Sequence, residues 1–188
     1  MNDIQIWSAL KEGQSSALEK IYKEHISYLI QYGCRFSQDE GTVEDCIHDL
    51  FVDLWRRRER LGDTSSIRAY LLVSLRRSIL KSVQKVQKRF SDKEPEELNF
   101  SASLDIEEMM VQAELEAEQA EQLNEALQNL SQRQREVLYL RFYQEMDYEE
   151  ICEIMGISYQ SGRNLLAGAL KSLRSLIKIP LFLLFMWF

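Results

Sequence analysis

The chain is poor in residues that interrupt regular structure, with only two prolines and seven glycines among 188 residues. All-β sandwiches and barrels need turn residues at short intervals, so this shortage argues against them. Hydrophobic residues make up 45% of the chain and charged residues 28%, which indicates a folded rather than a disordered protein. No segment repeats at a fixed period, which argues against a solenoid.

Cysteine and histidine are also scarce. The chain has Cys34, Cys46, Cys152, His25 and His48, too few and too scattered for a disulfide framework, and the Cys46–His48 spacing does not match a zinc module. We therefore expect free thiols in a reducing cytoplasm, no metal site and no cofactor. The sequence shows no nucleophile–base constellation and no phosphate-binding glycine loop, so we expect a protein that is not an enzyme.

Signals for export or membrane insertion are weak. The N-terminal residues lack a basic-then-apolar leader pattern, so we expect a cytoplasmic location. Residues 179–188 form an almost wholly apolar tail, but a helix needs roughly 20 such residues to cross a bilayer.

The charge is strongly segregated along the chain. The net charge of −7 alone argues against a partner made of phosphates. Residues 1–55 carry −6, residues 56–91 carry +9, residues 92–121 carry −10, and residues 122–188 are neutral. The average therefore hides a strongly basic block beside a strongly acidic one.

This segregation also predicts the domain organisation. The acidic stretch contains Pro95, whereas the blocks on either side of it contain no proline. We predict an all-α protein with two small helical domains, 1–91 and 122–178. They are joined by an acidic linker, 92–121, and followed by the tail.

We expect two helices in or next to the basic block. The first runs from about Thr42, a candidate cap, to Arg60. The second, over about 66–90, places Leu72, Leu75, Ile79, Val83 and Val86 on one side and Arg77, Lys81, Lys85 and Lys88 on the other. A solubilising face usually mixes both signs, and no acidic residue interrupts 64–91, so a phosphate-tracking surface is favoured over a merely solvated face.

The second domain has the layout of a helix-turn-helix. Ser131 and Gln134 predict a capping box, Asp147 predicts a second cap, Gly156 supplies a left-handed turn, and Ser158 begins the last helix. In such a motif the second helix enters the major groove with its N-terminal residues. These are Ser158, Tyr159, Gln160, Ser161, Arg163 and Asn164, among which Gln, Asn and Arg can hydrogen-bond base edges. From spacing alone, a helical hairpin that only packs remains an alternative.

Together the two domains resemble the sigma-70 family of bacterial initiation factors, in the extracytoplasmic-function (ECF) type that has only regions two and four. Three ordered motifs carry the resemblance: ALEKIY (17–22) with VEDCIHDLFVDLW (43–55), SIRAYL (66–71) leading into the basic helix, and LSQRQREVL (130–138) with YEEICEIMGIS (148–158). It covers about residues 15–90 and 122–177.

The resemblance implies a sigma factor that directs promoter recognition, −10 melting and transcription initiation. By position, the residues that would face the clamp helices of core RNA polymerase are Glu44, Asp45, Asp49, Asp53 and Trp55. Those that would face the −10 element are Arg68, Tyr70, Arg76, Arg77, Lys81, Lys85 and Lys88. Residues 158–164 would face the −35 element, the second domain would touch the polymerase flap, and the acidic linker would mimic a nucleic acid in the RNA-exit path.

The resemblance also implies a membrane-anchored anti-sigma factor as a partner and no small-molecule substrate. For the apolar tail, packing on the second domain, docking to an anti-sigma factor and contact with a membrane surface stay open. A polymerase-independent helix-turn-helix regulator and a helical adaptor that binds only protein are the alternative functions.

Three positions depart from the family pattern. Arg77 stands where Asn is usual, Gly162 where a β-branched residue commonly packs under the recognition helix, and Gly168 where a basic residue is frequent. Each glycine is expected to cost the helix about 1 kcal/mol.

Overall fold

The computed structural model describes residues 2–90, 100–101 and 117–176, and every regular element in these ranges is helical. This confirms the predicted all-α class. The chain forms two compact units, Met1–Leu98 and Asn99–Phe188, which are described separately below.

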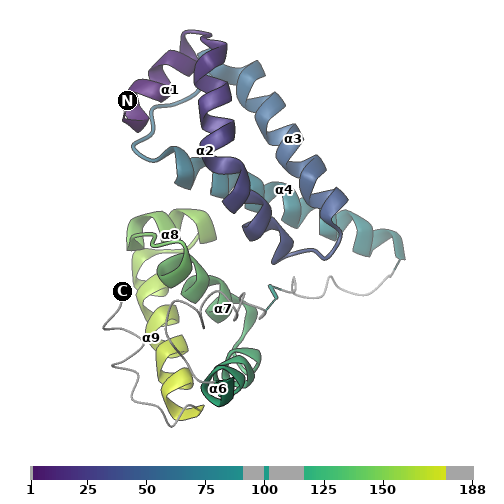
Figure 1. Ribbon diagram of the computed structural model, residues 1–188, viewed down its shortest axis with the longest axis vertical. Coiled ribbons are helices and arrows are strands. Elements are labelled where there is room, and N and C mark those ends of the chain that lie inside the picture. Colours follow the sequence, from purple (N-terminus) through teal and green to yellow (C-terminus); the bar gives the residue numbers. More distant parts are fainter. Residues whose placement is uncertain (1, 91–99, 102–116, 177–188) are drawn as a thin grey trace. The chain divides into compact units, whose positions relative to one another are not determined.

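The first unit is built from α1 (Asp3–Lys11), α2 (Ser15–Cys34), α3 (Glu40–Arg57) and the long α4 (Ile67–Phe90), with a 3-10 turn, η1 (Arg58–Arg60), after α3. Helices α2, α3 and α4 each pack on the other two, and α1 packs on α2 and η1 (Figure 1). Their shared core is largely aliphatic, and its fully buried members include Ile21, Leu29, Val43, Leu72, Leu75 and Ile79. The predicted inward face of the basic helix is thus confirmed for Leu72, Leu75 and Ile79.

A glycine sets the close approach of these helices. A methyl group at Gly33 on α2 would collide with Cγ1 of Val43 on α3 and would lie 3.2 Å from Cδ1 of Ile79 on α4. Only a residue without a side chain lets the three helices meet at this point.

The start of α3 corrects one prediction. The helix begins at Glu40, and its cap is Asp39 rather than Thr42. The Asp39 carboxylate accepts hydrogen bonds from the Thr42 amide (3.4 Å) and hydroxyl (2.7 Å), and these bonds lower the pKa of Asp39. A carboxylate one residue outside the helix satisfies the free amides of the first turn, which Thr42, already inside that turn, does not do.

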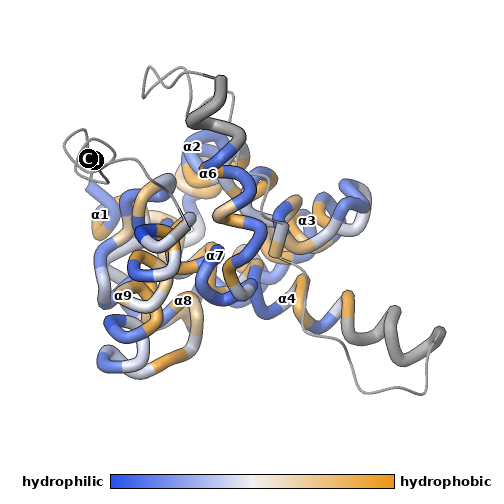
Figure 2. The backbone as a smooth tube through the Cα atoms, turned by 90° about the horizontal axis from the view of Figure 1, so that it is seen from below, coloured by the Kyte–Doolittle hydropathy of each residue, from blue (hydrophilic) through white to orange (hydrophobic). Residues whose placement is uncertain are grey.

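The second unit contains α6 (Ala117–Gln128), α7 (Gln132–Leu138), a π-helical turn, η2 (Tyr139–Tyr143), α8 (Tyr148–Met155) and α9 (Tyr159–Leu176). Helices α6, α7 and α8 all pack on α9. The capping boxes at Ser131 and Asp147 and the left-handed Gly156 (φ +63°) are as predicted. Figure 2 shows hydrophobic and hydrophilic residues alternating along each helix, as expected of amphipathic helices that share a core.

Two features of this unit were not predicted. The π-helical turn closes with the Gln144 amide donating to the Tyr139 carbonyl oxygen (3.0 Å), and the next residue, Glu145, has a positive φ of +50°. Phe100, within the range expected for the linker, is buried with its ring centroid 5.7 Å from that of Tyr139. Most other linker residues and the apolar tail lie outside the described residues.

Candidate functional site

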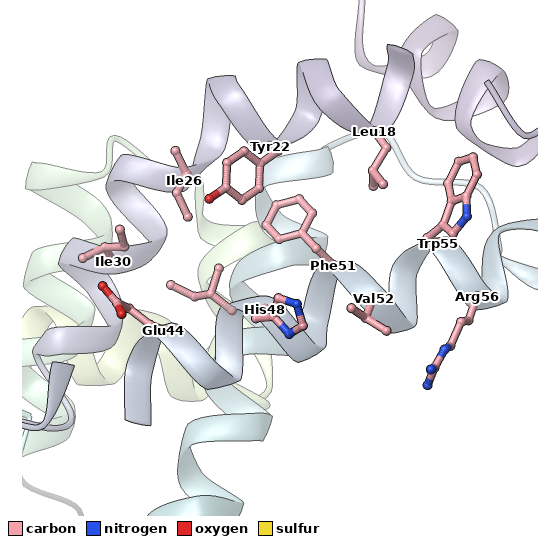
Figure 3. A pocket seen from close by; sticks show the side chains of 11 residues that line it. Leu18, Tyr22, Ile26, Ile30, Glu44, His48, Phe51, Val52, Trp55 and Arg56 are labelled. Atoms are coloured by element: carbon pink, nitrogen blue, oxygen red, sulfur yellow. The ribbon is translucent and has the colours of Figure 1, made fainter. Parts of the chain in front are cut away.

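An apolar groove lies between α2 and α3, with a volume of about 570 Å³ (Figure 3). Its lining consists of Leu18, Tyr22, Ile26 and Ile30 from α2, and of Glu44, Ile47, His48, Phe51, Val52, Trp55 and Arg56 from α3. The Tyr22 ring meets the edge of Phe51 at 5.1 Å between centroids, yet Tyr22 is 46% exposed. A large aromatic side chain left this exposed in a groove is typical of a protein-binding surface.

The groove contains two of the five residues expected to face a polymerase, Glu44 and Trp55. Asp45, Asp49 and Asp53 are exposed on α3 but do not line it. The surface therefore combines an apolar groove with an acidic helix face beside it. The groove was not predicted from the sequence, although the sequence holds a signal for it. The α2 lining residues recur every four positions, each one residue after the buried positions Ala17 and Ile21.

Trp55 has its ring partly covered by a cation. The guanidinium carbon of Arg58 lies 4.5 Å from the centroid of the Trp55 ring, and Arg58 Nη1 donates to the Trp55 carbonyl oxygen (2.9 Å). The indole thus lines the groove, with one face taken by Arg58.

The basic surface begins at the first turn of α4. Arg77 and Lys81 are exposed, whereas Arg68, Tyr70 and Arg76 are half-buried. The side chains of Lys85 and Lys88 lie outside the described part of the structure. An exposed pair four residues apart on one helix matches the spacing at which side chains share a face, so Arg77 and Lys81 present their charges together.

A partly buried polar cluster lies beneath this first turn. The Arg68 guanidinium carbon lies 4.9 Å from the Tyr28 ring centroid, and His25 meets the same ring edge-on at 5.2 Å. Burial lowers the pKa of His25, although the carboxylates of Asp3 and Glu24 oppose this shift. Burial also raises the pKa of Tyr28 far above its usual range, so both groups are neutral at physiological pH.

All six predicted recognition residues on the second unit are exposed: Ser158, Tyr159, Gln160, Ser161, Arg163 and Asn164. Ser158 Oγ accepts from the Ser161 amide (3.2 Å), which caps α9. Gln160 Nε2 donates to Asn164 Oδ1 (3.0 Å), so two amide side chains form one hydrogen-bonding edge on the helix. This edge and the nearby Arg163 supply both donors and acceptors for base edges.

Gly162 lies on the opposite side of the same helix and is buried against α8. A Cβ atom there would lie 2.6 Å from Cys152 Sγ. The space that a β-branched residue usually fills is therefore occupied by the Cys152 side chain. At Gly168 a Cβ would meet only Gln134 Nε2, at the ordinary distance of 3.6 Å.

The described residues contain neither a candidate metal site nor a candidate membrane-spanning helix. Among them, no group of three or more metal-ligating side chains is present, and no helix has the length and apolar character that crossing a membrane requires.

Family models match both units. The model described as "Sigma-70 region 2" matches residues 21–89, and that described as "Sigma-70, region 4" matches residues 120–173. Among curated proteins, RNA polymerase sigma factor YlaC of Bacillus subtilis (strain 168) is 26% identical over 143 residues, which is 76% of this chain and 81% of that protein. ECF RNA polymerase sigma factor SigL of Mycobacterium tuberculosis (strain H37Rv) is 24% identical over 172 residues, 89% of this chain and 92% of that protein.

Solved structures with a similar fold include two complexes. One is CnrH with the cytosolic domain of CnrY, with a TM-score of 0.61 and 21% identity, covering 93% of this chain and 96% of the other. The second is the sigma factor RpoE with the anti-sigma factor NepR from Bartonella quintana, with a TM-score of 0.60 and 19% identity, covering 86% and 96%.

Proposed function

Because the chain belongs to the sigma-70 family and is an RNA polymerase sigma factor of the ECF type, we propose which of its surfaces binds each partner in transcription initiation. The observation that carries the proposal is that the two family matches fall one on each structural unit, and each unit presents an exposed surface of the chemistry required. Such factors are regulators rather than enzymes, and we assign this chain no catalytic step.

The first unit binds core RNA polymerase through α3 and the groove beside it. Glu44 and Trp55 contribute from the groove, and the exposed Asp45, Asp49 and Asp53 contribute charge from the helix. An apolar groove supplies the desolvated centre of an interface, while carboxylates at its margin orient a basic partner helix.

The basic face of α4 binds the −10 element as it melts. Arg77 and Lys81 are placed to follow the phosphates of the displaced strand, and Arg68 and Tyr70 lie where the helix begins. Strand capture needs cationic groups and flat side chains rather than covalent chemistry, and this surface offers both. Arg76, Lys85 and Lys88 complete the proposed set.

The second unit binds the −35 element as a duplex. Its recognition helix directs Gln160, Arg163 and Asn164 away from the core, where they can enter the major groove. Ser158, Ser161 and Tyr159 stand at the helix N-terminus, a favourable place for a phosphate contact.

An anti-sigma factor that covers the groove is a further proposed partner. RpoE, which shares this fold, forms a complex with an anti-sigma factor. The groove between α2 and α3 is apolar enough to accept an amphipathic helix. The protein would then be held inactive in the cytoplasm, where polymerase and promoters are found.

Run-off transcription with the cognate core enzyme tests the assignment. Adding the full-length protein should create new start sites, whose upstream sequences define the −10 and −35 elements. A helix-turn-helix regulator that works without polymerase would instead bind duplex DNA alone and create no start sites with core enzyme. That result would contradict the proposed division of roles.

A further inference from the structure

Helix α1 lies outside the residues matched by the region 2 family model, which begins at residue 21. It nevertheless holds the segment that leads into the basic helix. We propose that Asp3, Trp7 and Lys11 are positioning residues that fix the loop 62–66 and the first turn of α4, and thereby set the geometry with which Arg68 and Tyr70 meet the −10 strand. This inference rests on the −10 role proposed above for α4.

The three residues are spaced at i, i+4 and i+8, so they share one face of α1. Each one holds a different point along the segment. Asp3 Oδ2 accepts from the amide of Ile67, the first residue of α4, at 2.9 Å.

The other two hold the loop itself. Trp7 Nε1 donates to the Gly62 carbonyl oxygen at 2.8 Å, and Lys11 Nζ donates to Asp63 Oδ1 at 2.7 Å. These contacts join positions more than 50 residues apart in the chain, and they lie along a single helical face.

Trp7, which makes the middle contact, is the most deeply buried of the three residues. Trp7 is only 2% exposed, and its ring meets Tyr70 edge-on at 4.8 Å between centroids. One indole therefore fixes a loop carbonyl with its N–H and a residue of the proposed −10 surface with its ring. A buried aromatic side chain with its donor satisfied has little rotational freedom to lose on binding, so it is suited to positioning.

Apolar packing does little to hold the loop at Gly62 and Asp63. A Cβ atom at Gly62 would meet no atom within 4 Å, and the Asp63 side chain is 95% exposed. Ordering such a polar segment costs conformational entropy, and burial of apolar surface does not offset that cost here. The contact with Lys11 also lowers the pKa of Asp63, so the carboxylate is charged at neutral pH.

Short-range hydrogen bonds then transmit the position of the loop to α4. Thr64 Oγ1 accepts from the Ser66 amide (3.2 Å) and donates to the Ser66 carbonyl oxygen (3.0 Å), and Ser66 Oγ accepts from the Ala69 amide (3.1 Å). A rigid first turn fixes Arg68 and Tyr70 relative to each other before DNA arrives. Such preorganisation favours the correct strand sequence over others, because a wrong base cannot be accommodated by movement of the loop.

The test measures selectivity rather than affinity alone. Holoenzyme made from the full chain and core polymerase selects single-stranded oligonucleotides from a pool randomised at six positions. The dissociation constants of the selected oligonucleotide and of a scrambled one are then measured for each variant. A variant that only lowers the fraction of folded molecules weakens the apparent binding of both oligonucleotides equally and leaves the ratio of their dissociation constants unchanged.

Two variants and one matched control are informative. Trp7→Phe keeps a ring against Tyr70 but removes the donor to Gly62, and should lower the selectivity ratio roughly three- to tenfold, the range for one lost hydrogen bond. Lys11→Met keeps the aliphatic stem, is not expected to affect folding, and should lower the ratio about twofold. Lys23→Met removes an exposed ion pair of similar length, to Glu19 at 2.6 Å, away from the loop, and should leave the ratio unchanged.

Arg68→Ala separates the positioning role of α1 from the −10 role of α4. If this variant weakens strand binding while Trp7→Phe and Lys11→Met leave the ratio at its original value, the positioning role is wrong and the −10 role of α4 stands. If Arg68→Ala also has no effect, the −10 assignment fails and the positioning role fails with it.

Discussion

Gly162 and Cys152 act as a complementary pair at the residue scale. Gly162 departs from the family pattern, and by sequence alone it looks like a loss of helix stability on α9. The structure gives a reason, since Cys152 Sγ lies where a side chain at Gly162 would be placed. Burial keeps the Cys152 thiol protonated by raising its pKa, so the residue serves as a small apolar filler.

We therefore expect Gly162→Ala to lower the free energy of unfolding by about 1 kcal/mol, because about 2 kcal/mol of overpacking exceeds about 1 kcal/mol of helix propensity. In a Cys152→Ala background the same change should instead stabilise the protein by up to about 1 kcal/mol. Urea unfolding of the original protein, the two single variants and the double variant measures this coupling. Equal effects of Gly162→Ala in both backgrounds would show that the two positions are independent.

His25 gives a pH dependence that also belongs to this scale. Burial holds its pKa below 6.5, while the unfolded chain has the ordinary value, so the unfolded state binds more protons below about pH 6.5. The free energy of unfolding should consequently fall as the pH drops through 6.5 towards the lowered pKa of the folded state, and this contribution should level off at higher pH, where the histidine of the unfolded chain is also deprotonated. Asp3 and Glu24 reduce this effect and Arg68 increases it.

Urea unfolding at pH 7.5 and pH 5.5 measures the loss. The His25→Gln variant should lose less stability than the original protein between these two values. The exposed His48, with 78% of its side chain accessible, is the matched control, and His48→Gln should behave like the original protein. A loss that is the same in all three proteins would mean that His25 does not cause it.

At the scale of elements, the helices could be predicted from the sequence because their signals are local. The capping boxes at Ser131 and Asp147 and the turn at Gly156 each involve residues within four positions of one another. The exposure of the recognition helix follows from its 3.6-residue period in the same way.

The features that sequence reasoning missed depend on pairing between distant elements. The groove forms where the second apolar stripe on α2, about 100° around the helix from the buried stripe, meets α3; the stripe can be read from the sequence, but its partner helix cannot. The contact of Trp7 with Gly62 joins residues 55 positions apart, and no periodic pattern in the sequence predicts it. The cap at Asp39 was missed for a different reason, because Asp39 and Thr42 are both good capping residues and only the backbone shows which one stands outside the helix.

The groove supports a prediction about an element pair. Tyr22→Ala should weaken binding to core polymerase about tenfold, since an aromatic side chain at the centre of an interface commonly contributes more than 1 kcal/mol. The fold should tolerate the change, because Tyr22 is nearly half exposed. Titration of labelled core enzyme with each variant measures the affinity.

Ile4 provides the control for this prediction. It is 60% exposed on α1 and does not line the groove. Ile4→Ala removes comparable apolar surface elsewhere and should leave polymerase affinity unchanged. If both variants weaken binding equally, general surface hydrophobicity rather than the groove accounts for the effect.

On the scale of the whole molecule, the arrangement of charge matters more than its sum. The net charge of −7 includes a basic block of +9 over residues 56–91 and the acidic linker, 92–121, of −10. We predict that the free factor binds DNA only weakly and binds promoters once it is joined to polymerase. The acidic linker, which follows the basic helix in the sequence, accounts for this weak binding, because its electrostatic field opposes that of the helix and repels the DNA phosphates.

Replacing the nine acidic residues of 92–116 by their amides tests this balance, since it changes the net charge from −7 to +2. The free variant should bind non-specific duplex DNA at least about tenfold more tightly at low ionic strength, with the gain shrinking as salt is added. A variant with the same residues in scrambled order, and with Phe100 and Ser101 kept in place, retains the charge and should bind as weakly as the original protein. If the neutralised variant binds no more tightly, the acidic linker does not oppose the basic face of α4, and weak binding of the free factor must arise from the two units themselves.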